Sequence, residues 1–214
     1  MSGRKIHKVS PELTQGSQYK HPANIESAAM TQGSTVLLYP GVYDAWTANL
    51  DDIALVGVGD VDEVILSTFN LNNGSANVIT VENVTIRGVN LAVTSGTSAF
   101  HALGNDNNAV VKFKGVKFTN AEFAITYHGN SFTGGNAASH TRVFVDRVDT
   151  SLVDRAIRGN CNVDIRHSVL NLSANTYFSN TGGAGLKTVF VYGNTSASGG
   201  VNAAGSGQTR IAGI

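Results

Sequence analysis

Cysteine, charge and long apolar runs are scarce in this sequence of 214 residues. Its single cysteine, Cys161, excludes a disulfide framework within the chain. No apolar run approaches ~18 residues, so we expect neither a transmembrane helix nor a membrane partner. The basic N-terminus lacks the apolar core of a secretory signal, which predicts synthesis in a host cytoplasm without a signal peptide. Charged residues make up 14% of the chain and balance to a net charge of zero, which argues against a nucleic-acid partner.

Short apolar strands, glycine and small polar residues are abundant instead, and they form a repeat. Each copy has apolar residues two positions apart and ends at a small or turn-forming residue, which is typical of a β-strand. Insertions of different length separate the copies, as in solenoid proteins, whose repeats stack on one another. The copies begin at Val84, Val111, Val143, Val163 and Val189, with looser matches at Val36 and Ile53.

A second set of matching positions lies between these copies and ends in asparagine. Asparagine tolerates the left-handed backbone of a sharp corner, and its amide can hydrogen-bond to the equivalent residue of the next repeat. We therefore predict a structural ladder of stacked asparagines, formed by Asn105, Asn130, Asn160 and Asn180.

These patterns predict an all-β fold, because the chain from residue 34 onward lacks the 3.6-residue apolar period of a helix. The expected architecture is a single-stranded parallel β-helix, a solenoid of about seven rungs. We expect residues 1–23 to form an extended basic attachment arm and residues 24–214 to form the β-helix domain.

Two adjacent segments connect the chain to a known family. The segment Ile25–Tyr43, which ends in Pro40-Gly-Val-Tyr, and the strand that follows it, Ile53–Asp60, resemble the first two rungs of pectin-lyase-like right-handed parallel β-helix proteins. This family also provides decoration and spike proteins of bacteriophage virions. The resemblance implies a right-handed coil with a short N-terminal helix over its first rung. It implies little about chemistry, because the motif belongs to the fold.

Many members of this family cut acidic polysaccharides, which requires carboxylates and a basic group on one face. The motifs that carry catalysis in polygalacturonases and pectin methylesterases are missing, and the histidines lack metal-ligand spacing. The best remaining cluster of acidic and basic groups consists of Asp146, Asp164, Arg155, Arg158 and Arg166.

Stacking the repeats offers a structural explanation for this cluster. The fourth position of each repeat reads Arg87, Lys114, Asp146, Arg166 and Tyr192, so Asp146 is expected between two basic residues in an outward ion-pair ladder. We therefore assign no catalytic residue, no metal site and no cofactor.

The two ends of the chain are the expected contact regions. Residues 1–23 hold four basic residues against Glu12 alone, and two readings of this segment are open: a solvated tail, or an arm that clasps a neighbouring subunit. The C-terminal segment is rich in small residues and ends on isoleucine, which either plugs the last rung or contacts another chain. The candidate partner-binding residues are Arg4, Lys5, Lys8, Tyr19, Lys20, Ile211 and Ile214.

The sequence thus predicts a structural protein of a virion, either a capsid decoration protein or a fibre or spike module. Candidate partners are capsid or tail subunits, further copies of the chain in a trimer, and cell-surface glycans. The alternative function is that of a carbohydrate-active or carbohydrate-binding protein that acts on an acidic polysaccharide.

Overall fold

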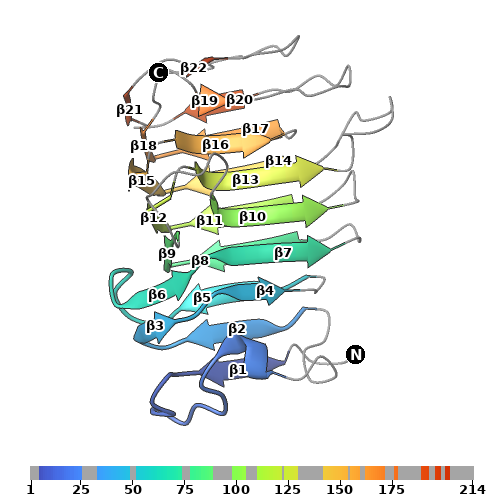
Figure 1. Cartoon of the computed structure of the whole chain (residues 1–214), viewed down its shortest axis with the longest axis vertical. Coiled ribbons are helices and arrows are strands. Elements are labelled where there is room, and N and C mark those ends of the chain that lie inside the picture. Colours follow the sequence, from blue (N-terminus) through green and yellow to red (C-terminus); the bar gives the residue numbers. More distant parts are fainter. Residues whose placement is uncertain are drawn as a thin grey trace.

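The computed structural model shows an all-β protein whose strands pile up along one axis (Figure 1). The structure describes residues 5–25, 33–48, 52–73, 78–88, 98–104, 110–121, 123–129, 142–153, 155–159, 162–171, 176–177, 189–192, 196–198 and 201–202. The only helix in these residues is the short 3-10 helix η1 (Pro22–Asn24). None of the described helices is long or apolar enough to cross a membrane.

The strands divide among four sheets of eight, seven, five and two strands. The eight-stranded sheet contains, in spatial order, β1 (Ile6–Val9), β2 (Thr35–Leu38), β5 (Ala54–Gly57), β8 (Val78–Glu82), β11 (Val110–Lys114), β14 (Arg142–Asp146), β17 (Asn162–Arg166) and β20 (Val189–Tyr192). The seven-stranded sheet contains β3 (Gly41–Tyr43), β6 (Val64–Ser67), β9 (Thr85–Arg87), β12 (Lys117–Thr119), β15 (Asp149–Leu152), β18 (Val169–Asn171) and β21 (Ser196–Ser198). The five-stranded sheet contains β4 (Trp46–Ala48), β7 (Phe69–Asn73), β10 (Ser98–Gly104), β13 (Phe123–Gly129) and β16 (Arg155–Gly159), and the two-stranded sheet contains β19 (Thr176–Tyr177) and β22 (Val201–Asn202).

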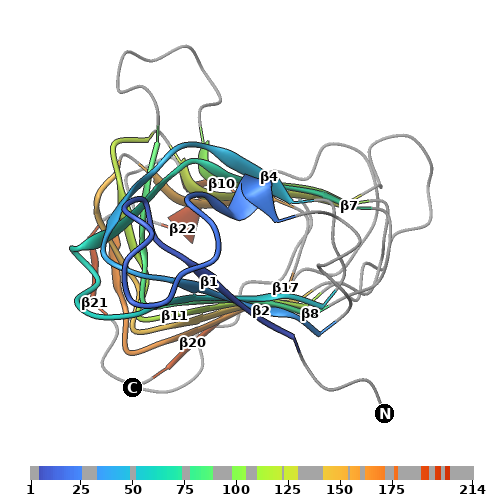
Figure 2. The same ribbon diagram turned by 90° about the horizontal axis from the view of Figure 1, so that it is seen from below.

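Strands that follow one another in the chain lie in different sheets, and neighbours within a sheet come from successive passes of the chain. The chain runs from β8 to β9 to β10, for example, and each of these pairs in parallel with the matching strand of the next pass, β11, β12 or β13. Figure 2 shows the eight-stranded and five-stranded sheets on opposite sides, with the seven-stranded sheet joining them at one edge.

Alternating side chains explain why these segments form strands with one buried face. In β11, Val111 and Phe113 point into the core while Lys112 and Lys114 are exposed, and the same alternation recurs in neighbouring strands. Aromatic contacts continue the core between sheets, since Phe113 meets the edge of Phe118 at a centroid distance of 5.5 Å. Burying side chains of this size stabilises the stack by roughly 1.5–3 kcal/mol each.

Left-handed backbone conformations mark the corner between the eight-stranded and seven-stranded sheets. The corner residues are Asn83, Gly115, Arg147 and His167, with φ between 46° and 60°. The backbone N–H of Asn83 donates to the carbonyl of Lys114, which lies one pass higher, and Gly115 and Arg147 repeat this bond with Asp146 and Arg166. The corners therefore both turn the chain and join successive passes.

The division into four sheets differs from the expected fold class. We predicted one single-stranded parallel β-helix with a short N-terminal capping helix and an extended N-terminal arm. The single solenoid is wrong, because the strands form four separate sheets. The alternation of apolar residues fixes which face of a strand is buried, but it does not fix how strands are divided among sheets. The expected capping helix falls largely on residues outside the described part, apart from the 3-10 helix that ends at Asn24.

The N-terminal segment is folded onto the stack instead of extending away from it. Residues Ile6–Val9 form β1, which pairs in parallel with β2. The Tyr43 hydroxyl lies 2.9 Å from the carbonyl oxygen of Val9, and a Cβ atom added to Gly41 would come within 2.5 Å of Pro11. Residues 5–25 therefore cover the first strands of their own chain, while the predicted boundary between residues 23 and 24 stays a prediction.

The register of the eight-stranded sheet confirms most of the predicted repeat and corrects its first copy. Val111, Val143, Val163 and Val189 stand opposite one another in successive strands, as expected. The residue below Val111 is Ile79, however, whereas Val84 precedes β9 of the seven-stranded sheet.

The five-stranded sheet shows a second shift of register. Gly104 pairs with Gly129 as expected, but Gly159 pairs with Tyr127. The third member of the predicted asparagine alignment is therefore displaced by two residues. The four asparagines themselves, Asn105, Asn130, Asn160 and Asn180, lie outside the described residues.

Candidate functional site

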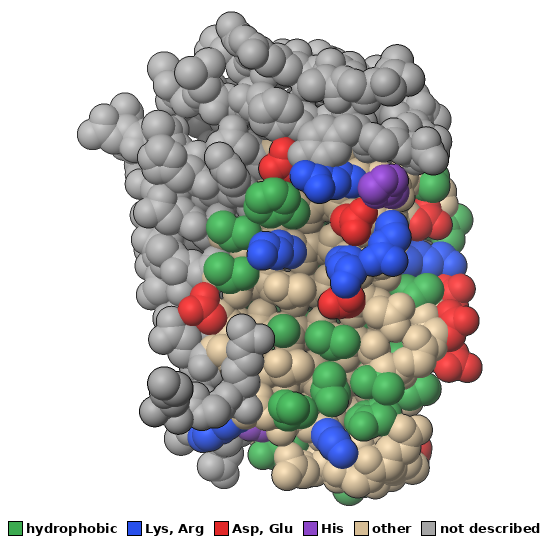
Figure 3. Space-filling model, turned by 180° about the vertical axis from the view of Figure 1, so that it is seen from behind, with side chains coloured by type: hydrophobic (Ala, Val, Ile, Leu, Met, Phe, Trp, Pro, Cys, Tyr) green, Lys and Arg blue, Asp and Glu red, His purple; other side chains and the backbone are tan. Residues whose placement is uncertain are grey.

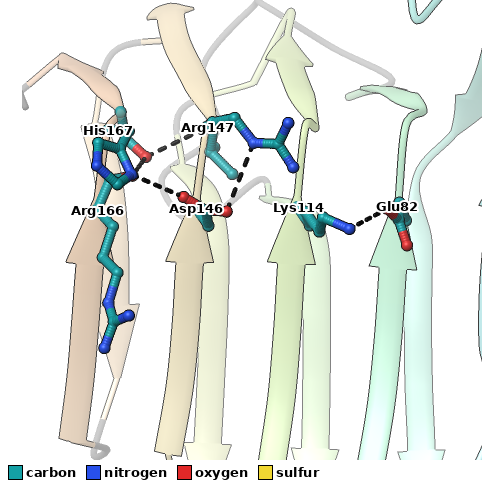
Figure 4. A network of polar contacts seen from close by, with 8 residues as sticks. Glu82, Lys114, Asp146, Arg147, Arg166 and His167 are labelled. Atoms are coloured by element: carbon teal, nitrogen blue, oxygen red, sulfur yellow. Dashed lines mark hydrogen bonds and ion pairs between the residues drawn. The ribbon is translucent and has the colours of Figure 1, made fainter.

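A column of alternating charge runs along the outer face of the eight-stranded sheet. The register places Glu82 beside Lys114, Lys114 beside Asp146, and Asp146 beside Arg166, each at the end of its strand. The signs therefore alternate from strand to strand. We call Glu82, Lys114, Asp146 and Arg166 the charged column (Figure 4).

The lower part of the charged column is a direct ion pair. Lys114 Nζ lies 2.6 Å from Glu82 Oε1, and the two side chains are 46% and 34% exposed. An ion pair this open to water adds at most about 1 kcal/mol to stability. These groups therefore remain available to charges presented by another molecule.

Asp146 is the centre of the upper part. Its Oδ1 lies 3.1 Å from His167 Nδ1, and its Oδ2 lies 3.5 Å from Arg147 Nε. The hydrogen bond from His167 is the main cause that lowers the pKa of Asp146, with a smaller effect from the charge of Arg147. Asp146 is therefore held as a carboxylate with basic groups around it (Figure 4).

Arg147 and His167 occupy left-handed corners that asparagine and glycine fill in the strands below. Their φ angles are 52° and 46°, and left-handed backbone costs a side-chain-bearing residue roughly 1–2 kcal/mol. Both side chains point back to Asp146, so the strained corner brings two basic side chains to one carboxylate.

The face around the charged column has two different halves. Following the register downward from Glu82, the outward positions are Val56, Leu37 and Lys8. Figure 3 looks onto this face and shows charged side chains gathered over its upper described part and hydrophobic ones below.

The structure separates the residues of the predicted polysaccharide site. Asp146, Asp164 and Arg166 belong to β14 and β17 of the eight-stranded sheet, but Arg155 and Arg158 belong to β16 of the five-stranded sheet. The two sheets lie on opposite sides of the stack (Figure 2). The five residues therefore do not converge on one face.

The predicted ladder is partly confirmed. Asp146 does lie between Lys114 and Arg166, with Tyr192 on the next strand. Arg87 is not the first member, because it lies in β9 of the seven-stranded sheet, beside Thr119. Sequence reasoning missed Glu82, which takes this place, and also missed the corner residues Arg147 and His167, although the corner position follows directly after each strand of the repeat.

The candidate contact residues of the N-terminal segment lie at the lower end of the stack. Lys5 and Lys20 are exposed, Lys8 is half-buried in β1, and Tyr19 packs partly against the core. Three other candidates, Arg4, Ile211 and Ile214, lie outside the described residues.

A second ion pair involves the seven-stranded sheet, through Lys117 of β12. Lys117 Nζ lies 2.7 Å from Asp62 Oδ1, and this hydrogen bond raises the pKa of Lys117.

Within the described ranges, no group of three or more His, Cys, Asp or Glu side chains could hold a metal ion.

The fold and its charged face define an all-β protein of stacked parallel sheets. No protein-family model matches the chain, and no curated protein is significantly similar to it. Among solved structures, the chain is similar to the crystal structure of Escherichia coli YbhC, with a TM-score of 0.58 over 99% of this chain and 72% of that chain. The identity is 14%, so the likeness concerns the fold alone.

Proposed function

We propose that this protein is a structural component of a large assembly, a bacteriophage virion in particular, that attaches through the lower end of its stack. The observation that carries the proposal is the position of β1. This strand is the first of the eight-stranded sheet. Lys5 precedes it, Lys8 lies within it and Lys20 follows its neighbour Tyr19, and Lys5 and Lys20 are exposed. Exposed basic side chains favour contacts with a partner of opposite charge. The outer edge of β1 itself is bonded in part by its own chain, since the Gln18 and Tyr19 N–H groups donate to the Lys8 carbonyl.

The interior of the stack supports a mechanical role. Eight strands hydrogen-bond in one parallel series, so a load at one end is carried through backbone bonds along the whole sheet. The segment next to β1 is also held firmly, because Gln18 N–H and Ser10 N–H bond to Lys8 and Tyr19 carbonyls. A contact made at this end is therefore transmitted to a rigid body.

Action on an acidic polysaccharide has less support from the geometry. A glycan site of that kind needs its carboxylates and arginines in one place. Arg155 and Arg158 lie on a different sheet from Asp146 and Asp164.

Co-sedimentation with particles from the native source tests the proposal. We expect the full-length chain to pellet with the particles at fixed stoichiometry, and Lys20→Glu to reduce the pelleted fraction. Arg87→Glu is the matched control, because it makes the same charge change at an exposed site on another sheet. A wild-type chain that stays in the supernatant at all particle concentrations would refute the assembly role.

A further inference from the structure

We propose that the outer face of the eight-stranded sheet binds a second copy of the same chain in antiparallel orientation. This contact goes beyond the assembly role and does not depend on it, because the order of signs in the charged column favours it. The column reads negative, positive, negative, positive from Glu82 to Arg166.

An alternating column of four charges is complementary to itself when one copy is turned upside down. A two-fold axis parallel to the strands, passing between β11 and β14, places Lys114 opposite Asp146 of the second copy. The same axis places Glu82 opposite Arg166 of the second copy. All four facing pairs then have opposite signs, and each pair occurs twice, as in any isologous interface.

The neighbouring outward column fits the same arrangement. It contains Thr80, Lys112, Phe144 and Asp164, in register with the charged column. The axis places Lys112 over Phe144 of the second copy, where a lysine ammonium can lie against the aromatic ring. Successive strands are spaced equally in both copies, about 4.8 Å apart, so the pairs stay in step along the face.

A parallel arrangement of two faces is disfavoured by the same residues. A two-fold axis along the stack that passes over this column would place Lys112 opposite Lys112 and Asp164 opposite Asp164 of the second copy, and one over the charged column would place each of its four residues opposite itself. Like charges facing each other in an interface repel and reject that pairing. The signs on the face therefore select the antiparallel orientation.

The side chains of this face are accessible to another molecule. Lys112, Lys114 and Arg166 are exposed, and Figure 3 shows the charged side chains at the surface of the described part of the molecule. Val78, at the start of β8, is 42% exposed and adds apolar area beside the two columns. An interface made mainly of such charges is weak and sensitive to salt.

Sedimentation velocity of the full-length chain at increasing concentration tests the proposal. We expect a monomer–dimer equilibrium whose dissociation constant rises at least about tenfold between low and high salt, because exposed ion pairs are screened. Lys114→Glu alone places Glu opposite Asp146, and Asp146→Lys alone places Lys opposite Lys114. Each variant should therefore remain monomeric where the wild-type chain is half dimeric.

Mixing the two variants gives the decisive measurement. A Lys114→Glu chain and an Asp146→Lys chain present opposite signs at all four facing pairs, so the mixture should form a heterodimer. If either substitution prevented dimerisation only by disturbing the fold of its own chain, mixing the two variants would not restore a dimer. Circular dichroism of each variant confirms that it is folded, and Arg87→Glu, on the seven-stranded sheet, should dimerise like the wild type.

Three outcomes would overturn the proposal. One is a wild-type chain that stays monomeric at the highest concentration and lowest salt. Another is a trimer, or a dimer that both single variants leave intact. The third is a mixture of the two variants in which both chains stay monomeric.

Discussion

Replacing Asn83 by alanine should remove much of the stability of the corner between two sheets. The Asn83 side-chain amide donates two hydrogen bonds to the pass below, to the Gly57 carbonyl at the end of β5 at 3.1 Å and to the Gly59 carbonyl just beyond it at 2.8 Å. Its backbone has a φ of 55°, in the left-handed region that asparagine tolerates and alanine does not. One residue therefore both turns the chain and joins two passes.

The expected cost follows from these two contributions. Each partly exposed hydrogen bond contributes about 0.5–1 kcal/mol, and left-handed backbone costs alanine roughly 1–2 kcal/mol. Asn83→Ala should therefore lower the free energy of unfolding by about 2–4 kcal/mol.

Urea denaturation, followed by the fluorescence of the single tryptophan, measures this change. Trp46 is buried and stacks on Phe69 at a centroid distance of 5.2 Å, so unfolding exposes it. Asn120→Ala is the matched comparison, because Asn120 has a φ of 59° and donates to the Gly88 carbonyl. A loss below about 0.5 kcal/mol for Asn83→Ala would refute the account of the corners.

Three further predictions concern the same stack. Gly57→Ala should destabilise by about 1–3 kcal/mol in urea, because a Cβ atom at Gly57 would overlap the carbonyl oxygen of Asn83; full stability would contradict this packing. Gly115 has a φ of 60° and open space around it, so only backbone strain should penalise a side chain there. Gly115→Val should lower the free energy of unfolding by more than about 1 kcal/mol and Gly115→Asn by less than about 0.5 kcal/mol. Equal losses of stability in the two variants would show that backbone strain is not the cause. Because its folded pKa is lowered, Asp146 stabilises the protein above its unfolded pKa of about 4, and this contribution is lost as the pH falls through the folded pKa. Asp146→Asn should therefore cost well under about 1 kcal/mol at pH 7, and in urea titrations the difference from wild type should shrink as the pH falls below the unfolded pKa; a constant difference would exclude the carboxylate as its source.

The strands of the eight-stranded sheet illustrate what alternation in a sequence can and cannot predict. Val111, Val143, Val163 and Val189 were aligned correctly because each lies at or next to the start of a strand with the same alternation. The copy before them was misplaced because the strand at Ile79 and the strand at Val84 have nearly the same alternation and lie side by side in the chain. Alternation cannot tell which of two adjacent strands belongs to a given sheet.

The corner residues and the contacts of Asp146 also could not be predicted from the pattern of the sequence. Asn83, and Asn120 after β12, each bond a carbonyl of a neighbouring pass through the side-chain amide, but in the sequence they look like any other asparagine of an Asn-rich chain. Arg147 and His167 were missed because a positive φ is uncommon for residues other than glycine, although histidine is one of the types enriched there. Their contacts with Asp146 follow from the strand register, which brings both side chains to this carboxylate.

The N-terminal segment differs from expectation for a physical reason. Its basic residues favoured a solvated or clasping arm, but Ile6–Val9 alternates in the same way as the later strands and joins their sheet. Val9 is fully buried there, and this burial stabilises the folded position over an extended one.

The register of the charged column is the central claim, since the site and the proposed second-copy contact both depend on it. Cysteines placed at 114 and 146, in a Cys161→Ser background, would lie on paired residues of β11 and β14. Their Cα atoms would be about 4.8 Å apart, within the range of a disulfide, whereas those of a 112 and 146 pair would be about 8 Å apart. We predict that mild oxidation forms an intrachain disulfide in the Lys114→Cys/Asp146→Cys chain and not in the Lys112→Cys/Asp146→Cys chain, as measured by intact mass and thiol titration at low protein concentration. A disulfide in the second chain and none in the first would contradict the register and the account built on it.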